Sequence, residues 1–182
     1  MKFPLLKTER LVLRRVLKQD AQDLYRILGD EEIMRYFGAE TYTSIEQMLD
    51  MIAWYDYSFR ERDAVRFGIA LKGTDRLIGT CGFHSWEPTE FRAEVVAVLA
   101  KEYWNQGYMT EALRRVIRYG YEEMNLFRIQ AKVEPPNLAS RKMFENLGFQ
   151  EEGTLRAFAY INHEFRDKIV YSRLKTDREK SC

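Results

Sequence analysis

Cysteine and histidine are both scarce in this chain of 182 residues, which has two of each. Cys81 lies inside an apolar segment and Cys182 is the last residue, so the two do not form the spaced set that a disulfide framework needs. No cluster of Cys, His and carboxylate residues has metal-ligand spacing. The sequence therefore predicts neither a disulfide scaffold nor a bound metal.

The chain also lacks an excess of charge of one sign and lacks long hydrophobic runs. Its 29 Lys and Arg residues nearly cancel its 28 Asp and Glu residues, whereas a nucleic-acid partner calls for a basic excess. No apolar run approaches membrane-spanning length, and the N-terminus lacks the apolar stretch of a signal peptide. We expect no nucleic-acid partner, no membrane partner and a cytoplasmic location.

No internal repeat, low-complexity tract or Gly/Ser-rich linker divides the sequence. Hydrophobic residues make up 46% and charged residues 31%, which is an ordinary globular balance. We therefore predict one domain over residues 1–174 and a polar C-terminal tail over residues 175–182.

The first half of the chain changes from helical to strand periodicity. Alternation over residues 10–14 predicts a strand, and Asp20 is expected to cap a helix that ends at Gly29. Ser44 and Gln47 have the spacing of a capping box, which predicts a second helix. Residues 65–72 and 77–83 then read as two strands of a hairpin.

The second half predicts a sheet with helices packed against it. Residues 95–100 are apolar without alternation, as in a central strand covered on both faces. A helix follows residues 104–110, a strand covers residues 127–133, and Asn137 caps another helix that Gly148 closes. The last third reads as two strands joined near residues 162–164. The fold class is therefore α/β (or α+β) with a mixed sheet.

The segment between the central strand and its helix has the features of an anion-binding loop. The first N–H groups of a helix lack backbone partners, and the helix dipole is positive at that end. Gly107 allows the backbone to approach a ligand closely. We predict that a pyrophosphate binds to this loop, whose residues are Trp104, Asn105, Gln106, Gly107, Tyr108, Met109 and Thr110.

The order of these motifs resembles the GNAT acetyltransferase superfamily. The resemblance rests on a strand, Trp-x-x-Gly-x-Met, a helix, a strand, Asn-x-x-Ser, a helix and Leu-Gly-Phe. The family's pyrophosphate motif is Arg/Gln-x-x-Gly-x-Gly/Ala, of which Gly107 is kept while Trp104 and Met109 differ. The resemblance implies a mostly antiparallel sheet of about seven strands, about four helices, a splayed central strand pair and acetyl-CoA as co-substrate.

Within that superfamily, the chain resembles the branch of ribosomal-protein N-terminal acetyltransferases (RimJ/RimL-type) in residues 8–14, 34–37, 78–83, 107–112, 137–149 and 152–156. This implies that the acceptor is the N-terminal α-amine of a ribosomal or other protein. Two alternatives stay open: acetylation of a small amine such as an amino acid, polyamine or antibiotic, and a non-catalytic CoA-binding regulator. A homodimer is a family-level expectation.

The resemblance also implies roles for individual residues. The backbone of Val98 and Leu99 would pair with the pantetheine arm and polarise the thioester carbonyl, and the Asn137 side chain would bond the same arm. Many members of the superfamily carry a tyrosine acid where Phe144 stands here. The ribosomal branch is thought to use the serine at the position of Ser140, which is therefore the candidate acid for the leaving thiolate.

The base is harder to assign, because residues 155–160 lack the glutamate that some members of the branch carry. Glu94, at the start of the central strand, is the remaining carboxylate in a suitable place. It could instead form an ion pair with Arg92 or a neighbouring strand. The acceptor groove is expected to be lined by Tyr36, Phe37, Phe83, His84 and Trp86.

Overall fold

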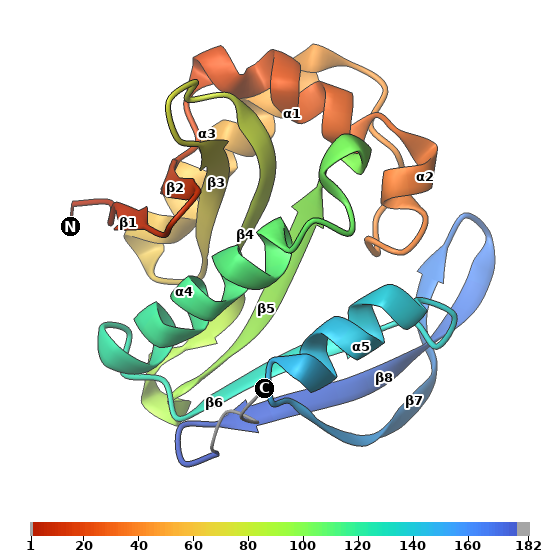
Figure 1. Ribbon diagram of the computed structural model, residues 1–182. Coiled ribbons are helices and arrows are strands. Elements are labelled where there is room, and N and C mark those ends of the chain that lie inside the picture. Colours follow the sequence, from red (N-terminus) through yellow and green to blue (C-terminus); the bar gives the residue numbers. More distant parts are fainter. Residues whose placement is uncertain (1, 178–182) are drawn as a thin grey trace.

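One mixed sheet of eight strands runs through the computed structural model, which describes residues 2–177 (Figure 1). The strand order is β1-β2-β3-β4-β5-β6-β8-β7, and every neighbouring pair is antiparallel except β5 and β6. The bounds are β1 Leu6–Lys7, β2 Leu11–Arg15, β3 Val65–Leu71, β4 Leu77–Glu87, β5 Arg92–Leu99, β6 Arg128–Val133, β7 Gln150–Ile161 and β8 Glu164–Leu174.

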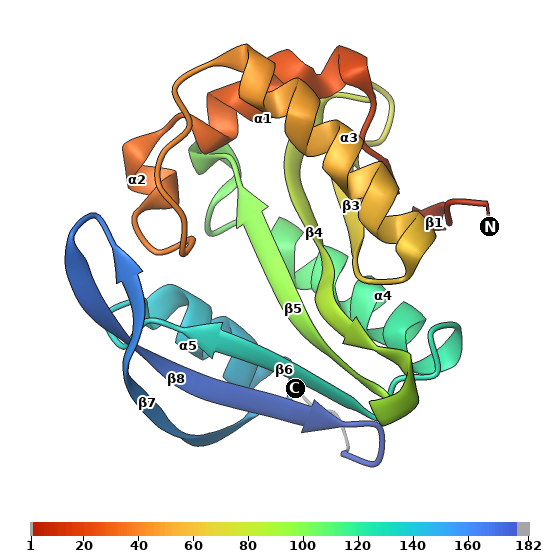
Figure 2. The same cartoon turned by 180° about the vertical axis from the view of Figure 1, so that it is seen from behind.

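Five α-helices cover the two faces of this sheet within the described residues. They are α1 Ala21–Leu28, α2 Glu31–Met34, α3 Ile45–Glu61, α4 Tyr108–Glu122 and α5 Leu138–Asn146. Figures 1 and 2 show α4 and α5 on one face and α1 and α3 on the other. The mostly antiparallel sheet with flanking helices is confirmed. The expected seven strands and four helices were each one too few, because β1 and α2 span only two and four residues.

Two predicted helix starts differ in how their first N–H groups are satisfied. At α3 the capping box between Ser44 and Gln47 is present as predicted. At α1 Asp20 stands at the N-cap position but makes no side-chain cap bond. Its carboxylate instead accepts from the Arg14 guanidinium at 2.8 Å and from the Leu17 N–H at 2.7 Å. The prediction that Asp20 caps the helix was therefore wrong in its chemistry, because a nearby arginine competes for the same oxygens.

The central strand pair separates along its length. β5 and β6 pair only through Arg92↔Arg128, Ala93↔Ile129 and Glu94↔Gln130. Beyond Glu94, β5 continues to Leu99 paired with β4 alone, while β6 continues to Val133 paired with β8. Residues 95–99 thus have a strand on one side only. Figure 2 shows the two strands opening away from each other.

Apolar side chains form one core on each side of the sheet. The core under α4 and α5 includes Phe67, Phe83 and Tyr171, and the core under α1 and α3 includes Leu24, Met48 and Leu77. The first of these cores includes residues of β3, β4 and β5 and of β6 and β8, which lie on the two sides of the opening between β5 and β6. No helix among residues 2–177 has the length and apolarity to span a membrane. Most of the predicted tail, residues 178–182, lies outside the described residues.

Candidate active site

A cleft of about 720 Å³ occupies the opening between β5 and β6. Its walls are residues 95–99 of β5 and residues 131–133 of β6, closed at one end by the start of α4 and on one side by α5. Residues 35–38 and the β7–β8 pair border the other end. The cleft therefore has two ends that are built from different parts of the chain.

The loop before α4 forms the first end. Gly107 has a φ of 77° and stands at the N-cap of α4, and Asn105 also has a positive φ of 58°. The left-handed turn directs the chain into the helix so that the first N–H groups of α4 face the cleft end. Those N–H groups and the positive helix dipole together favour a bound anion.

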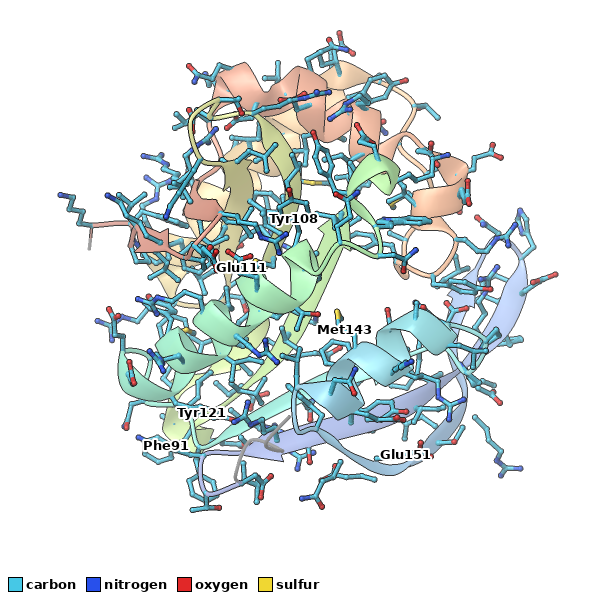
Figure 3. The ribbon with its side chains drawn as sticks, viewed as in Figure 1. Phe91, Tyr108, Glu111, Tyr121, Met143 and Glu151 are labelled. Atoms are coloured by element: carbon cyan, nitrogen blue, oxygen red, sulfur yellow. The ribbon has the colours of Figure 1, made fainter. Side chains whose placement is uncertain are left out.

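The first strands clamp this loop from outside. The Glu111 carboxylate accepts hydrogen bonds from the Thr8 hydroxyl at 2.5 Å and the Arg10 N–H at 2.8 Å, and pairs with the Arg10 guanidinium at 2.7 Å. Arg10 also donates to the Gln106 carbonyl at 3.0 Å and lies 4.1 Å from the centre of the Tyr108 ring. Figure 3 shows Tyr108 and Glu111 at the start of α4. The N-terminal segment thereby fixes the loop geometry.

The walls next to the loop come from β5 and α5. The Trp104 indole donates to the Leu99 carbonyl at 2.8 Å, which ties the loop to the end of β5. The Asn137 side-chain oxygen accepts from the Ser140 N–H at 3.2 Å and caps α5. This leaves the Asn137 side-chain NH₂ to donate into the cleft. Figure 3 shows Met143 pointing from α5 toward α4.

Glu94 lies in the middle of the cleft at the point where β5 and β6 separate. Its side chain is 9% exposed, and its Oε2 pairs with the Lys132 ammonium at 2.5 Å and accepts from Gln130 at 3.4 Å. Its Oε1 lies 3.6 Å from Nε2 of His84, a distance slightly beyond a direct hydrogen bond. The ion pair is thus made with the neighbouring strand. Arg92 pairs instead with Glu87 and Glu90.

His84 is held in its neutral form next to that carboxylate. Burial lowers the pKa of His84 below its ordinary value of 6.5, with the cationic Arg66 and Lys132 acting in the same direction and Glu94 opposing them. Its Nδ1 lies 3.0 Å from the Ser85 hydroxyl. A neutral imidazole beside a buried carboxylate can take up a proton, which is what removal of a proton from an amine requires.

The second end of the cleft is rich in cations. Glu134, with a side chain only 4% exposed, binds the Lys168 ammonium at 3.0 Å and the Arg166 guanidinium at 3.2 Å. Arg166 also donates to the Arg35 carbonyl at 3.1 Å, which links β8 to the end of α2. Both Lys168 and Arg35 line the cleft. One carboxylate is therefore shared by two cations, with a third nearby.

Most of the residues that the sequence singled out line this cleft together. They are Tyr36, Phe37, His84, Glu94, Val98, Leu99, Trp104, Asn105, Gly107, Tyr108, Met109, Thr110, Asn137 and Ser140. Three others do not line it. Phe83 is fully buried against Gly120 of α4, because strand alternation turns it to the face opposite His84. Trp86 packs on the same core, and Gln106 turns its side chain to the Glu102 carbonyl at 2.7 Å.

Five charged residues in or beside the cleft were not assigned to the site by the sequence analysis, namely Arg35, Lys132, Glu134, Arg166 and Lys168. A signal for two of them was present, because Gln130, Lys132 and Glu134 alternate with the buried apolar residues of β6. Such alternation places all three on one face of the sheet. That this face is the cleft, and that Lys168 lies opposite, depends on the pairing of β6 with β8.

A second hollow of about 760 Å³ runs along the outer side of α4 and shares Gly107 and Thr110 with the cleft. Its charged residues include Arg118 and Glu122, which lie 3.9 Å apart on the same helix. It has no splayed strands and no buried carboxylate, so the cleft is the better candidate for chemistry. Residues 2–177 contain no group of three or more His, Cys, Asp or Glu side chains that could hold a metal ion.

Comparison with known proteins shows the family and the fold to which this chain is similar. Residues 10–150 match the family described as "Acetyltransferase (GNAT) domain". The "Uncharacterized N-acetyltransferase YoaA" of Bacillus subtilis is 38% identical over 95% of this chain and 98% of that protein. The spermidine N(1)-acetyltransferase of Escherichia coli is 25% identical over 86% of this chain and 82% of that protein. The structure of Mycobacterium smegmatis RimJ in complex with CoA-disulfide superposes with a TM-score of 0.88 at 20% identity, covering 98% of this chain and 90% of that one.

Proposed function

The chain belongs to the GNAT acetyltransferase family, whose activity is acetyl-CoA-dependent N-acetyl transfer, and on that premise we propose how its cleft divides the work. Acetyl-CoA lies with its pyrophosphate on residues 104–110 and its pantetheine arm between β5 and β6. The acceptor is a primary amine, and we propose the N-terminal α-amine of a protein, such as a ribosomal protein. The amine enters from the end bordered by residues 35–38 and β8.

The single observation that carries the donor assignment is the separation of β5 from β6. Residues 95–99 have β4 on one side and the cleft on the other, so their outward N–H and C=O groups face the cleft without a strand partner. Buried backbone groups need hydrogen-bond partners, and the amide groups of a pantetheine arm supply them in the manner of an added strand. Val98 and Leu99 lie at the end of β5 next to the loop, where the arm would enter between the strands.

The reaction requires one proton to leave the amine and one to reach the sulfur. The neutral amine attacks the thioester carbonyl carbon, the C–N bond forms and the C–S bond breaks. Glu94, through Oε1 and a bridging water shared with His84, accepts the amine proton. The Ser140 hydroxyl donates a proton to the departing thiolate and is replenished from water. Phe144 has no proton to donate and packs in the core.

The energetics of deprotonation favour an α-amine as acceptor. At pH 7 a lysine ammonium needs ~4.6 kcal/mol to lose its proton, whereas an α-ammonium needs only ~1–1.4 kcal/mol. The Oε2 of Glu94 is already paired with Lys132, so only its Oε1 is open to the bridging water. A site with a restrained base suits the more easily deprotonated amine.

The names of the similar proteins point to different acceptors, so they do not choose between them. The E. coli relative is named for spermidine, a small polyamine, and the RimJ structure has a similar fold. Acetylation of a small amine is accordingly the second candidate. A polyamine acceptor, which carries several positive charges, would be expected to need an acidic groove.

A thiol-release assay tests the proposal. The protein is incubated with acetyl-CoA and four kinds of amine: N-terminal peptides, lysine peptides whose N-terminus is blocked, polyamines and aminoglycosides. We expect free CoA to appear fastest with the N-terminal peptides and to appear more slowly in Ser140→Ala. Binding of acetyl-CoA without release of CoA for any amine would contradict catalysis and favour a CoA-binding regulator. Absence of acetyl-CoA binding would contradict the donor assignment itself.

A further inference from the structure

The charges around the acceptor end of the cleft are not those of a polycation site. Of the acidic residues of the N-terminal helices, Glu32 lines the cleft, but it is paired with Lys101 at 3.0 Å. Asp56 pairs with Arg15, outside the cleft. Glu31 and Glu40 are exposed and do not line it. The acidic groups that could attract a polyamine are therefore neutralised or turned away.

Cations, by contrast, are in surplus at this end. Glu94 and Lys132 cancel each other, and His84 is neutral because burial lowers its pKa. Beyond this pair, the single buried carboxylate of Glu134 is shared by Lys168 and Arg166. The second acid near Arg166 is Glu164, whose side chain is 74% exposed. Among the buried groups of this cluster, two cations therefore share one carboxylate.

This surplus lies in a place where water has limited access. The Lys168 side chain is 8% exposed and that of Arg166 is 20% exposed. The Nε of Arg166 is buried and has no hydrogen-bond partner among the described residues. Glu164, the other acid near Arg166, is 74% exposed and lies 3.7 Å away. Arg166 does not itself line the cleft, but Lys168, which shares Glu134 with it, does. Buried cations that share one carboxylate are costly, and an anion bound at Lys168 would reduce that cost.

The segment above this cluster leaves room for such a group. Gly38 has a φ of 91°, and a side chain there would begin 3.7 Å from the Lys168 ammonium. The adjoining Arg35 is exposed, and both it and Gly38 line the cleft. Arg166 donates a hydrogen bond to the Arg35 carbonyl. This bond fixes the backbone of Arg35 beside the cluster, so the Arg35 guanidinium lies within reach of the same place.

We propose that the acceptor carries a carboxylate a few bonds from its amine, and that Arg35 and Lys168, which line the cleft, bind this carboxylate. The inference rests on the proposed function and narrows its substrate class to N-terminal peptides with an acidic residue near the amine, or to acidic amino acids. The amine then points toward Glu94 while the carboxylate lies at the β8 end. Polyamines, which bring only positive charge, are poor acceptors.

Matched acceptors test this directly. Three peptides that differ only at the second residue (Asp, Asn or Lys) are compared with free aspartate and with spermidine, and kcat/KM is measured by CoA release. We expect the Asp peptide to exceed the Asn peptide by about tenfold at low salt, with a smaller ratio at high salt. A peptide that outperforms free aspartate identifies a protein N-terminus as the source of the carboxylate. If free aspartate is the better acceptor, a free amino acid is the source of the carboxylate.

Two arginine variants assign the preference to this cluster. Arg35→Glu reverses the charge of an exposed side chain, and it should bring the Asp to Asn ratio to about one or below. Arg60→Glu makes the same charge change at an exposed position in α3 that does not line the cleft, and it should leave the ratio unchanged. An equal or lower rate for the Asp peptide in the unmodified protein, or spermidine as the best acceptor, overturns the inference.

Binding separates this inference from the proposed function. Calorimetric titration of the Asp and Asn peptides into CoA-loaded protein measures the preference even if no amine is acetylated. Tighter binding of the Asp peptide without turnover would uphold the carboxylate site and contradict the catalytic proposal. Equal binding of the two peptides together with rapid turnover would uphold the catalytic proposal and contradict the carboxylate site.

Discussion

The two ends of the cleft are built by different means. The donor end uses backbone groups: the start of α4 after Gly107 and the free side of residues 95–99. The acceptor end uses side chains from separate elements, with Arg35 after α2, Glu134 after β6, and Arg166 and Lys168 on β8. A backbone site depends on the course of the chain, whereas a side-chain site depends on strand register.

The two ends of the cleft also differ in which substitutions they tolerate. At the donor end the anion-binding groups are backbone N–H groups, so side chains such as those of Trp104 and Met109 do not supply the ligands themselves. At the acceptor end the buried carboxylates of Glu94 and Glu134 are paired with Lys132 and Lys168, so removing either lysine leaves a buried carboxylate short of a partner. We expect substitutions at the acceptor end to alter which amine is used, and substitutions that displace the backbone of the loop to alter coenzyme binding.

Glu94→Gln should have the largest effect, because Glu94 lies where the two ends meet. Loss of a general base lowers kcat by about 100-fold or more, while the acetyl-CoA Kd changes by less than about twofold. Steady-state kinetics and calorimetry measure the two quantities. Glu123→Gln, at an exposed position after α4, is the matched control and should be active. Unchanged kcat in Glu94→Gln would exclude Glu94 as the base.

Gly107→Ala should affect the donor end alone. With φ at 77°, an alanine strains the turn and displaces the first N–H groups of α4, so the acetyl-CoA Kd should rise about tenfold. Gly73→Ala is the control. Gly73 also has a positive φ, of 85°, and has open space around its Cβ position, but it lies in the β3–β4 turn and not in the loop before α4. A Kd that rises equally in both variants would show general loss of structure rather than a loop effect.

Glu111→Ala should loosen the clamp on the loop without touching the coenzyme. Thr8 and Arg10 both lose their carboxylate partner, so we expect Tm to fall by a few degrees and the acetyl-CoA Kd to rise by about threefold. Thermal unfolding with and without acetyl-CoA checks both. Glu122→Ala on the same helix serves for comparison, because its pairing with Arg118 is exposed. If the two variants behave alike, the clamp has no role in coenzyme binding.

His84 should make the free energy of unfolding of the protein weakly dependent on pH. Its pKa is lowered in the folded protein, mainly by burial, whereas in the unfolded chain it titrates near ~6.5. The unfolded state therefore binds more protons as the pH falls through ~6.5, and the free energy of unfolding decreases there. His84→Asn should reduce the change in Tm between about pH 7.5 and about pH 5.5. His163→Asn, in the exposed β7–β8 turn, should retain the full change.

The contrast explains which parts of the site could be predicted from sequence. A glycine before an amphipathic helix and after an apolar strand is a local pattern, and it placed residues 104–110 at the cleft end. The partner of Glu94 was not local, because Lys132 reaches it through the parallel pairing of β5 with β6. Phe83 was assigned to the groove although it points into the core, since one step along a strand reverses the face.

The fold was easier to predict than the site, because the spacing of apolar residues along the sequence indicates directly which residues are buried. The hairpin of β3 and β4, the box at Ser44 and the final strand pair all follow from patterns of a few residues. The two-residue β1 and the four-residue α2 are too short to show a period, and they are the elements that were missed. The cluster of Glu134, Arg166 and Lys168 requires the β6–β8 pairing, which no local pattern specifies.

Two-substrate kinetics on three proteins tests the division of the cleft most directly. The KM for acetyl-CoA and the KM for the Asp peptide are measured for the unmodified chain, Gly107→Ala and Arg35→Glu. We predict that Gly107→Ala raises only the KM for acetyl-CoA, by about tenfold, and that Arg35→Glu raises only the KM for the peptide. A variant that shifts both constants equally, or Arg35→Glu acting on acetyl-CoA alone, would contradict separate donor and acceptor ends.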